Sequence, residues 1–145
     1  MSRYRWELTE TVIPANDAFP QGVRVRRAVV PATLEWNGLE TDEFPCLLDT
    51  GADYCQFPNK FLTDLRLNIA DLPCGPVNAL LAEVDNVPFA TVNLRIPGFA
   101  PLSVRAGFTE KLNKENAGLL GIAGALSQFK ILLDFQDGFF IVGDD

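Results

Sequence analysis

Residues 46–55 read CLLDTGADYC, and this stretch decides how the chain folds. Apolar residues run directly into Asp49, which predicts a carboxylate at the end of a strand that emerges from the core. Such an aspartate can be an ordinary turn residue or a helix N-cap. Two neighbours favour a functional loop instead. The hydroxyl of Thr50 can lock a tight loop through hydrogen bonds, and Gly51 lets another backbone approach closely.

A second apolar element lies far downstream, at Leu119, Leu120 and Gly121. Two apolar residues followed by glycine could pass beneath the Asp-Thr-Gly loop and support it. The alternative is ordinary packing at the entry to a helix. For residues 118–129 we predict a turn that leads into a second short helix.

The rest of the chain reads as short strands joined by turns. From residue 23 onward apolar and polar residues alternate, which is typical of strands. Asn37-Gly38 predicts a type I′ hairpin turn, because both positions tolerate positive φ. We expect a short helix at 59–67, with Asn59 as a possible N-cap, and a turn at 73–76. This pattern predicts an all-β sandwich or barrel with one or two short helices.

The composition and charge of the chain exclude several classes of function. The chain has 145 residues, about one domain. Its net charge of −7 argues against nucleic acid and against an anionic membrane as partners. We see no signal peptide and no apolar run of about 18 residues, so we expect a cytoplasmic protein. There is no histidine, which removes Ser-His-Asp and Cys-His catalysis and most zinc sites. We therefore expect no metal and no cofactor, and three reduced cysteines.

Taken together, the Asp-Thr-Gly-Ala run after an apolar strand and the later apolar-apolar-glycine element resemble the retropepsin-type aspartic proteases. This family includes retroviral proteases, Ddi1-like domains and bacterial relatives. The resemblance covers residues 23–142, and residues 1–22 would form an N-terminal extension or an edge strand. It implies a closed acid-protease-type β-barrel that is active as a symmetric homodimer.

The resemblance also implies an activity, that of an aspartic endopeptidase acting on a polypeptide substrate. Such enzymes need two aspartates, whereas this chain offers one at Asp49. A two-fold axis makes one residue into a facing pair, so the partner would be a second copy of the chain. The two carboxylates would share one proton and activate a water molecule between them.

The resemblance assigns roles to individual positions. The turn at Gly75 falls where relatives place the tip of a flap, and Asp53 falls where relatives bind substrate backbone. The catalytic candidates are Asp49, Thr50 and Gly51. The substrate-binding candidates are Ala52, Asp53, Tyr54, Gln56, Gly75 and Leu119. Leu120 and Gly121 are the candidates for support of the catalytic loop.

Two features depart from the family pattern. Relatives commonly carry an arginine directly after the apolar-apolar-glycine element, and here Ile122 occupies that position. Arg5 and Arg105 are our candidates for pairing with Asp53 in its place. Pro76 would stiffen the flap and remove a backbone donor. Two other functions therefore stay open: a catalytically inactive dimeric peptide-binding module, and a β-barrel interaction domain with a chance Asp-Thr-Gly-Ala.

Overall fold

The computed structural model describes residues 2–79 and 82–144 of an all-β chain. Four short helical segments interrupt the strands. They are α1 (Phe61–Asp64) and the 3₁₀ turns η1 (Ile69–Asp71), η2 (Glu110–Leu112) and η3 (Leu126–Gln128). The strands are β1 (Arg3–Glu7), β2 (Thr9–Ile13), β3 (Val23–Arg27), β4 (Val29–Trp36), β5 (Leu39–Glu40), β6 (Phe44–Leu48), β7 (Cys55–Pro58), β8 (Cys74–Ala79), β9 (Ala82–Arg95), β10 (Leu102–Thr109), β11 (Gly118–Leu120), β12 (Lys130–Asp134) and β13 (Phe139–Gly143). None of the helices in the described ranges has the length and apolar character needed to cross a membrane.

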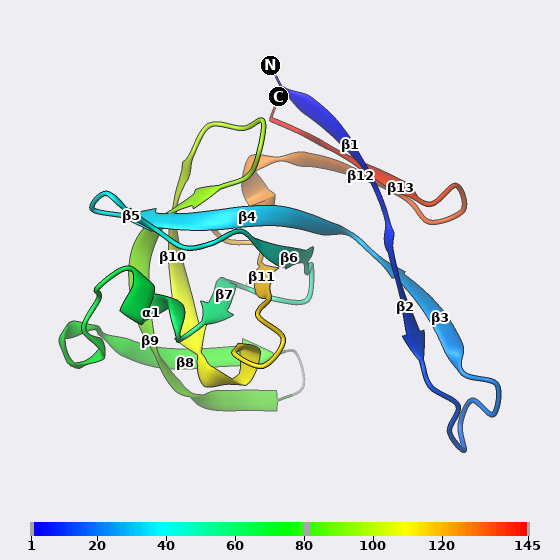
Figure 1. The fold of residues 1–145 in the computed structure, drawn as a ribbon, viewed down its shortest axis with the longest axis horizontal. Helices are drawn as coiled ribbons and strands as arrows, with labels where there is room; N and C mark the ends of the chain where they lie inside the picture. The colour runs from blue at the N-terminus through cyan, green and yellow to red at the C-terminus, as the bar shows by residue number, and fades with distance from the viewer. Residues whose placement is uncertain (1, 80–81, 145) are drawn as a thin grey trace.

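The main sheet closes on itself. Its order is β5-β4-β6-β11-β7-β10-β9-β8, and β4 also pairs with β9, at residues 33–35 and 93–95. Strands β4, β6, β11, β7, β10 and β9 therefore form a closed barrel (Figure 1). Both sides of these six strands are paired, and β5 and β8 are the edge strands of this sheet. The predicted all-β class and closed barrel are confirmed.

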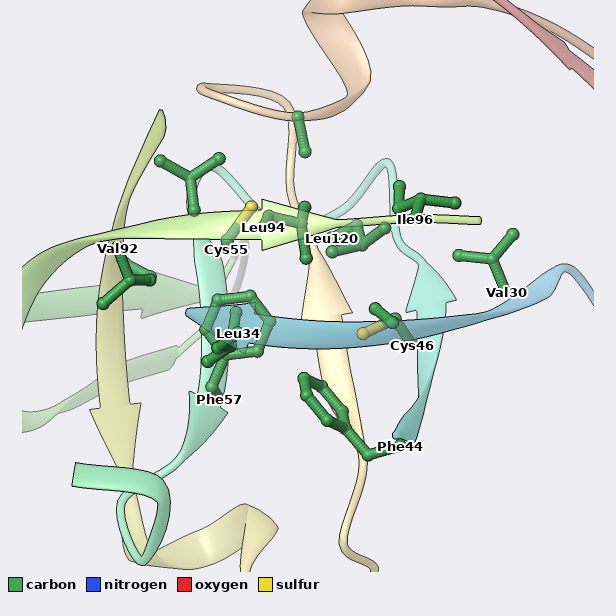
Figure 2. Close-up of a cluster of buried hydrophobic side chains, with 14 of the residues drawn as sticks. Val30, Leu34, Phe44, Cys46, Cys55, Phe57, Val92, Leu94, Ile96 and Leu120 are labelled. Atoms are coloured by element: carbon green, nitrogen blue, oxygen red, sulfur yellow. The ribbon is translucent and has the colours of Figure 1, made fainter. Parts of the chain in front are cut away.

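Alternate residues of the barrel strands fill its interior. In β4 the buried positions are Val30, Ala32 and Leu34, and β9 repeats the period at Val92 and Leu94. Figure 2 shows the valines and leucines of this set converging with side chains of β6 and β7 on one core. In that core, Phe44 and Phe57 meet edge to face. Successive side chains of a strand point to opposite faces, so the alternation in the sequence becomes an inside and an outside.

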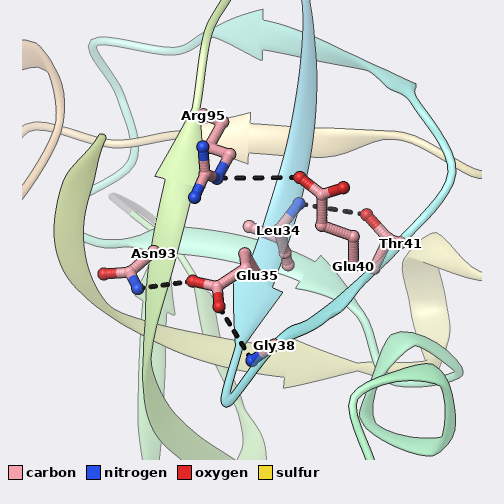
Figure 3. A network of polar contacts seen from close by, with 7 residues as sticks. All are labelled: Leu34, Glu35, Gly38, Glu40, Thr41, Asn93 and Arg95. Atoms are coloured by element: carbon pink, nitrogen blue, oxygen red, sulfur yellow. Dashed lines mark hydrogen bonds and ion pairs between the residues drawn. The ribbon is translucent and has the colours of Figure 1, made fainter. Parts of the chain in front are cut away.

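The predicted hairpin turn forms at Asn37 and Gly38, whose φ angles are 51° and 81°. A polar network surrounds it (Figure 3). The Glu35 carboxylate accepts a hydrogen bond from Asn93 Nδ2 at 2.7 Å and another from the Gly38 backbone N–H at 3.0 Å. The Thr41 hydroxyl accepts from the backbone N–H of Leu34 at 3.0 Å. These contacts hold the hairpin against β9.

We predict that Glu35 makes the stability of this hairpin depend on pH. Its hydrogen bonds, first from Asn93 and then from Gly38, lower the pKa of the carboxyl below its usual range. Because the pKa of Glu35 is lower in the folded state than in the unfolded state, its ionised form stabilises the folded state at pH values above the unfolded-state pKa. That stabilisation is lost as the pH falls through the folded-state pKa. The difference in melting temperature between wild type and Glu35→Gln should therefore shrink between pH 6 and pH 3. Glu43→Gln, at an exposed site, is the control. A pH-independent difference would contradict this role.

Two predicted helices need correction. Helix α1 lies inside the expected range, but Lys60 occupies its N-cap position. The Asn59 side chain instead accepts a hydrogen bond from Asn113 Nδ2 at 2.7 Å, which ties the helix entry to the loop after β10. The segment 118–129 begins as strand β11 and reaches only a 3₁₀ turn at η3. Strand β11 forms because its backbone pairs with two strands that are distant in the sequence, and a local sequence pattern does not predict such pairing.

The N-terminal residues form two further sheets. Strand β1 is an edge of the three-stranded order β1-β13-β12, called here the terminal sheet. Trp6 stacks on Phe140 across this sheet, with 5.6 Å between the ring centroids. Strands β2 and β3 pair only with each other and extend away from the barrel (Figure 1). Both termini lie together beside the terminal sheet.

The three thiols are unpaired in the structure. Cys46 and Cys55 are buried in the barrel, and loss of hydration raises the pKa of each above the usual value. Both thiols therefore stay protonated at neutral pH and act as small apolar side chains, as predicted for Cys46. Cys74 is exposed at the start of β8.

Candidate active site

The Asp-Thr-Gly loop arches over the end of a central strand. Strand β11 runs parallel to β6 and antiparallel to β7, with Leu119 opposite both Leu47 and Gln56. Residues 49–54 connect β6 to β7, and β11 lies between those two strands. The connection must therefore cross the C-terminal end of β11. This arrangement brings together two sequence elements that are far apart along the chain.

Backbone hydrogen bonds fix the position of Asp49. Its N–H donates to the carbonyl oxygen of Leu120 at 3.0 Å, and its own carbonyl accepts from the N–H of Ala52 at 3.1 Å. Its carboxylate Oδ1 accepts from the N–H of Gly51 at 2.9 Å. Asp49 is half-buried, whereas Thr50 and Gly51 are exposed. One carboxylate oxygen is thus oriented by the loop at the surface of the barrel.

Gly121 lies directly under the loop. A Cβ there would overlap the carbonyl of Tyr54 and would lie 2.8 Å from the carbonyl oxygen of Ala52. The next two residues continue the contact, because the Ile122 N–H donates to the Ala52 carbonyl at 2.9 Å and the Ala123 N–H donates to the Asp53 carbonyl at 2.8 Å. The absence of a side chain at 121 allows the two backbones to come this close.

One row of residues crosses the outer face of the barrel beside Asp49. Leu47, Leu119 and Gln56 stand opposite one another across β6, β11 and β7, and all three are half-buried. The pairings extend this row to Val29 in β4 and to Gly107 and Phe89 in β10 and β9. Sequence reasoning missed Val29, Leu47 and Phe89 as candidates. The alternation of β6 marks Leu47 as outward-facing, but only the strand order shows that it is next to Leu119.

A groove of about 430 Å³ lies alongside Tyr54. The rings of Tyr54 and Phe89 meet edge to face, with centroids 5.9 Å apart. Arg105 is the one residue of the lining that carries a formal charge. The lining consists of Tyr54, Gly75, Pro76, Phe89, Arg105, Ala123 and Gly124.

The predicted turn at Gly75 is wrong, although Gly75 does lie in this groove. Cys74 begins strand β8, and Gly75 pairs with Val87 of β9. A Cβ on Gly75 would lie 3.3 Å from Cε1 of Phe89, so the glycine accommodates that ring. The pairing of β8 with β9 continues to Ala79 and Ala82, and residues 80 and 81 lie outside the described residues. Pro76 is tolerated because β8 is an edge strand, where a missing N–H breaks no ladder.

The two arginines suggested as partners of Asp53 have other contacts within the chain. Arg5 pairs with Glu7 at 2.8 Å, and its guanidinium lies 4.3 Å from the centroid of the Phe139 ring. Arg105 donates to the Thr91 hydroxyl at 3.2 Å. Asp53 is exposed, and Ile122 beside it is 47% exposed. Among the described residues, no cluster of histidine, cysteine or acidic side chains could hold a metal ion.

Comparison with known proteins identifies the fold. No protein-family model matches the sequence, and no curated protein sequence matches it. Among solved structures, the chain is similar to the crystal structure of a retropepsin-like aspartic protease from Rickettsia conorii, with a TM-score of 0.58 and 16% sequence identity. The match covers 98% of this chain and 95% of that chain. The chain therefore has the all-β, acid-protease-type barrel fold of a retropepsin-like aspartic protease.

Proposed function

We propose that this protein is an aspartic endopeptidase in which Asp49 residues from two copies of the chain activate one water molecule. The observation that carries the proposal is the position of Asp49. Its carboxylate is half-buried at the end of β6, in a loop that β11 supports from below. The retropepsin-like fold and the single Asp-Thr-Gly point to the same chemistry. A two-fold axis beside the loop would supply the second carboxylate.

The mechanism requires the two carboxylates to share one proton, because two facing negative charges repel. The ionised carboxylate takes a proton from the water as its oxygen attacks the carbonyl carbon of the peptide. The protonated carboxyl donates its proton to the carbonyl oxygen, which forms a tetrahedral diol. As the C–N bond breaks, the carboxyl that took the water's proton gives it to the departing nitrogen, and one hydroxyl of the diol returns its proton to the other carboxylate. The carboxylic acid and the amine are released, and the pair again holds one proton.

The surroundings of Asp49 suit an extended peptide. In the half-buried row, Leu47 and Leu119 offer apolar contact beside the reacting bond. The exposed carboxylate of Asp53 can accept hydrogen bonds from substrate backbone. The groove beside Tyr54 would receive a side chain farther along the peptide.

A non-catalytic peptide-binding dimer is the second candidate. The observation that favours it is Ile122, which is exposed at the position where relatives carry the arginine that ties the dimer together. An altered dimer could keep the cleft but misplace the two carboxylates, whose chemistry tolerates little displacement.

A digest of proteome-derived peptides between pH 4 and pH 9, with cleavage sites read by mass spectrometry, distinguishes the two candidates. The enzyme should cleave between apolar residues, with a bell-shaped pH profile whose maximum lies on the acidic side of neutral. A rate that climbs steadily to pH 9 would indicate a different catalytic base. Binding of peptides without cleavage at any pH would favour the non-catalytic dimer.

A further inference from the structure

The groove beside Tyr54 is lined by one cation, Arg105. This arginine is exposed on β10, and its Nη1 donates to the Thr91 hydroxyl at 3.2 Å. A guanidinium has five N–H donors, and this neutral hydroxyl is its one hydrogen-bond partner among the described side chains. None of the ion pairs between described residues includes Arg105. Most of its donors and its full charge are therefore available to a ligand in the groove.

The alternation of β10 places Arg105 on the face that the proposed substrate would cover. Val104 and Ala106 are buried in the core of the barrel. The alternate residues Arg105 and Gly107 therefore lie on the outer face. Gly107 is part of the row of residues that crosses this face beside Asp49. A peptide that rests along the row would pass next to the guanidinium of Arg105.

The chemistry of the groove indicates which side chain it would bind. A guanidinium binds a carboxylate through two parallel hydrogen bonds. The rings of Tyr54 and Phe89 lie in the same lining and can contact the methylene groups of a bound side chain. We propose that Arg105 selects peptides that carry an acidic side chain, aspartate or glutamate, which enters this groove. The inference rests on the peptide binding of the proposed function, and it does not require that the peptide be cleaved.

The strand order places this acidic side chain away from the reacting bond. From β6, which leads into Asp49, to β10, which carries Arg105, the order β6-β11-β7-β10 makes three steps between neighbouring strands. At about 4.8 Å a step, the separation is roughly 14 Å, the length of about four residues of extended peptide. Closer to the bond, the negative charges of Asp49 and Asp53 would repel an acidic side chain. The preference should therefore appear at one position, about four residues from the cleaved bond.

The charge of the whole chain predicts the opposite preference. With a net charge of −7, the field of the protein favours a lysine over a glutamate at every position of the peptide. A preference for glutamate that is confined to one position would therefore indicate a local cation.

The test changes one residue of the peptide and one residue of the protein. Peptides based on the best-cleaved sequence of the digest, capped at both ends, carry glutamate, glutamine or lysine at each position in turn. At one position, wild type should show a kcat/KM about fivefold higher for glutamate than for glutamine, and lower still for lysine. Arg105→Glu should reverse this order, so that lysine becomes the best of the three. Sodium chloride at about 1 M should weaken both preferences, because salt screens exposed charges.

Two further variants isolate the charge and the shape of Arg105. Arg24→Glu makes the same charge change at an exposed arginine of β3, which extends away from the barrel, and it should keep the wild-type preference. Arg105→Lys keeps the charge but loses the paired donors, so it should keep only part of the preference. Because Arg105 also contacts Thr91 on the neighbouring strand, a melting curve shows that each variant folds.

The outcomes separate this inference from the proposed enzyme. Cleavage of the glutamate and glutamine peptides at equal rates at every position, or a preference that Arg105→Glu leaves unchanged, would overturn the role of Arg105 and leave the endopeptidase standing. If no peptide is cleaved, the endopeptidase is wrong, and fluorescence anisotropy compares the same three substitutions in the tightest-binding peptide of the digest. A lower Kd for the glutamate peptide, reversed in Arg105→Glu, would support the role of Arg105 in a non-catalytic module. Equal Kd values, or no binding of any peptide, would overturn it.

Discussion

Asp49→Asn is expected to lower peptide hydrolysis by several orders of magnitude while the chain still folds. The amide is nearly the same size as the carboxylate, and its oxygen can still accept the hydrogen bond from Gly51. It cannot take a proton from water, so the principal catalytic group is lost. The measurement is kcat/KM on the best peptide from the digest, with the melting temperature as a check on folding.

Asp53→Asn is the matched control, because it makes the same chemical change four residues away at an exposed position. It should raise KM or weaken the dimer and leave kcat largely intact. If the Asp49→Asn variant cleaves peptides as well as wild type does, the aspartic protease mechanism is wrong. A different result is that neither wild type nor Asp49→Asn cleaves peptides, yet the Asp49→Asn dimer melts at a higher temperature than the wild-type dimer. The variant would then have lost the repulsion between two facing carboxylates, so the pair is present in wild type and the protein is a non-catalytic dimer.

Gly121→Ala should produce the second large effect. The added Cβ would overlap the Tyr54 carbonyl, and neither that backbone nor the carbonyl of Ala52 can rotate away as a side chain can. Displacing the backbone should lower the free energy of unfolding by about 3 kcal/mol. A shift of about 1 Å in the loop that carries Asp49 should also lower kcat about 100-fold. Denaturant titration and steady-state kinetics measure the two losses.

Gly75→Ala is the comparison for stability, because its Cβ would meet only the edge of the Phe89 ring at 3.3 Å. A ring can move by a few tenths of an ångström, so this variant should lose much less stability than Gly121→Ala. Equal stabilities for Gly121→Ala and wild type, with equal kcat, would show that β11 does not support the loop.

Local sequence signals predicted the parts of this fold that local chemistry determines. Asn37-Gly38 predicted its hairpin turn because two consecutive positive φ angles suit few other residues. The alternation in β4 and β9 predicted strands because the barrel interior selects every second side chain. The position of Asp49 at a strand end followed from the apolar run before it.

Non-local pairing decided the parts that the sequence did not reveal. Residues 118–120 are small and apolar, which suits a helix entry equally well, and they become a strand only because β6 and β7 lie on either side. Residues 73–76 include two prolines and a glycine, which favour a turn. Strand β8 nevertheless begins there, because an edge strand tolerates proline. The neighbours of Leu119 along the outer row depend on strand order, so Leu47 and Phe89 could not be identified beforehand.

Titration of wild type with Asp49→Asn shows whether one active site needs Asp49 from two chains. Exchange of subunits would place wild-type chains in mixed dimers that hold one carboxylate. If only wild-type homodimers cleave, the activity per wild-type chain falls to about one-half in an equimolar mixture and to about one-tenth at ninefold excess. An unrelated protein at the same concentration should have no effect. Activity per wild-type chain that stays constant at ninefold excess would contradict a shared site.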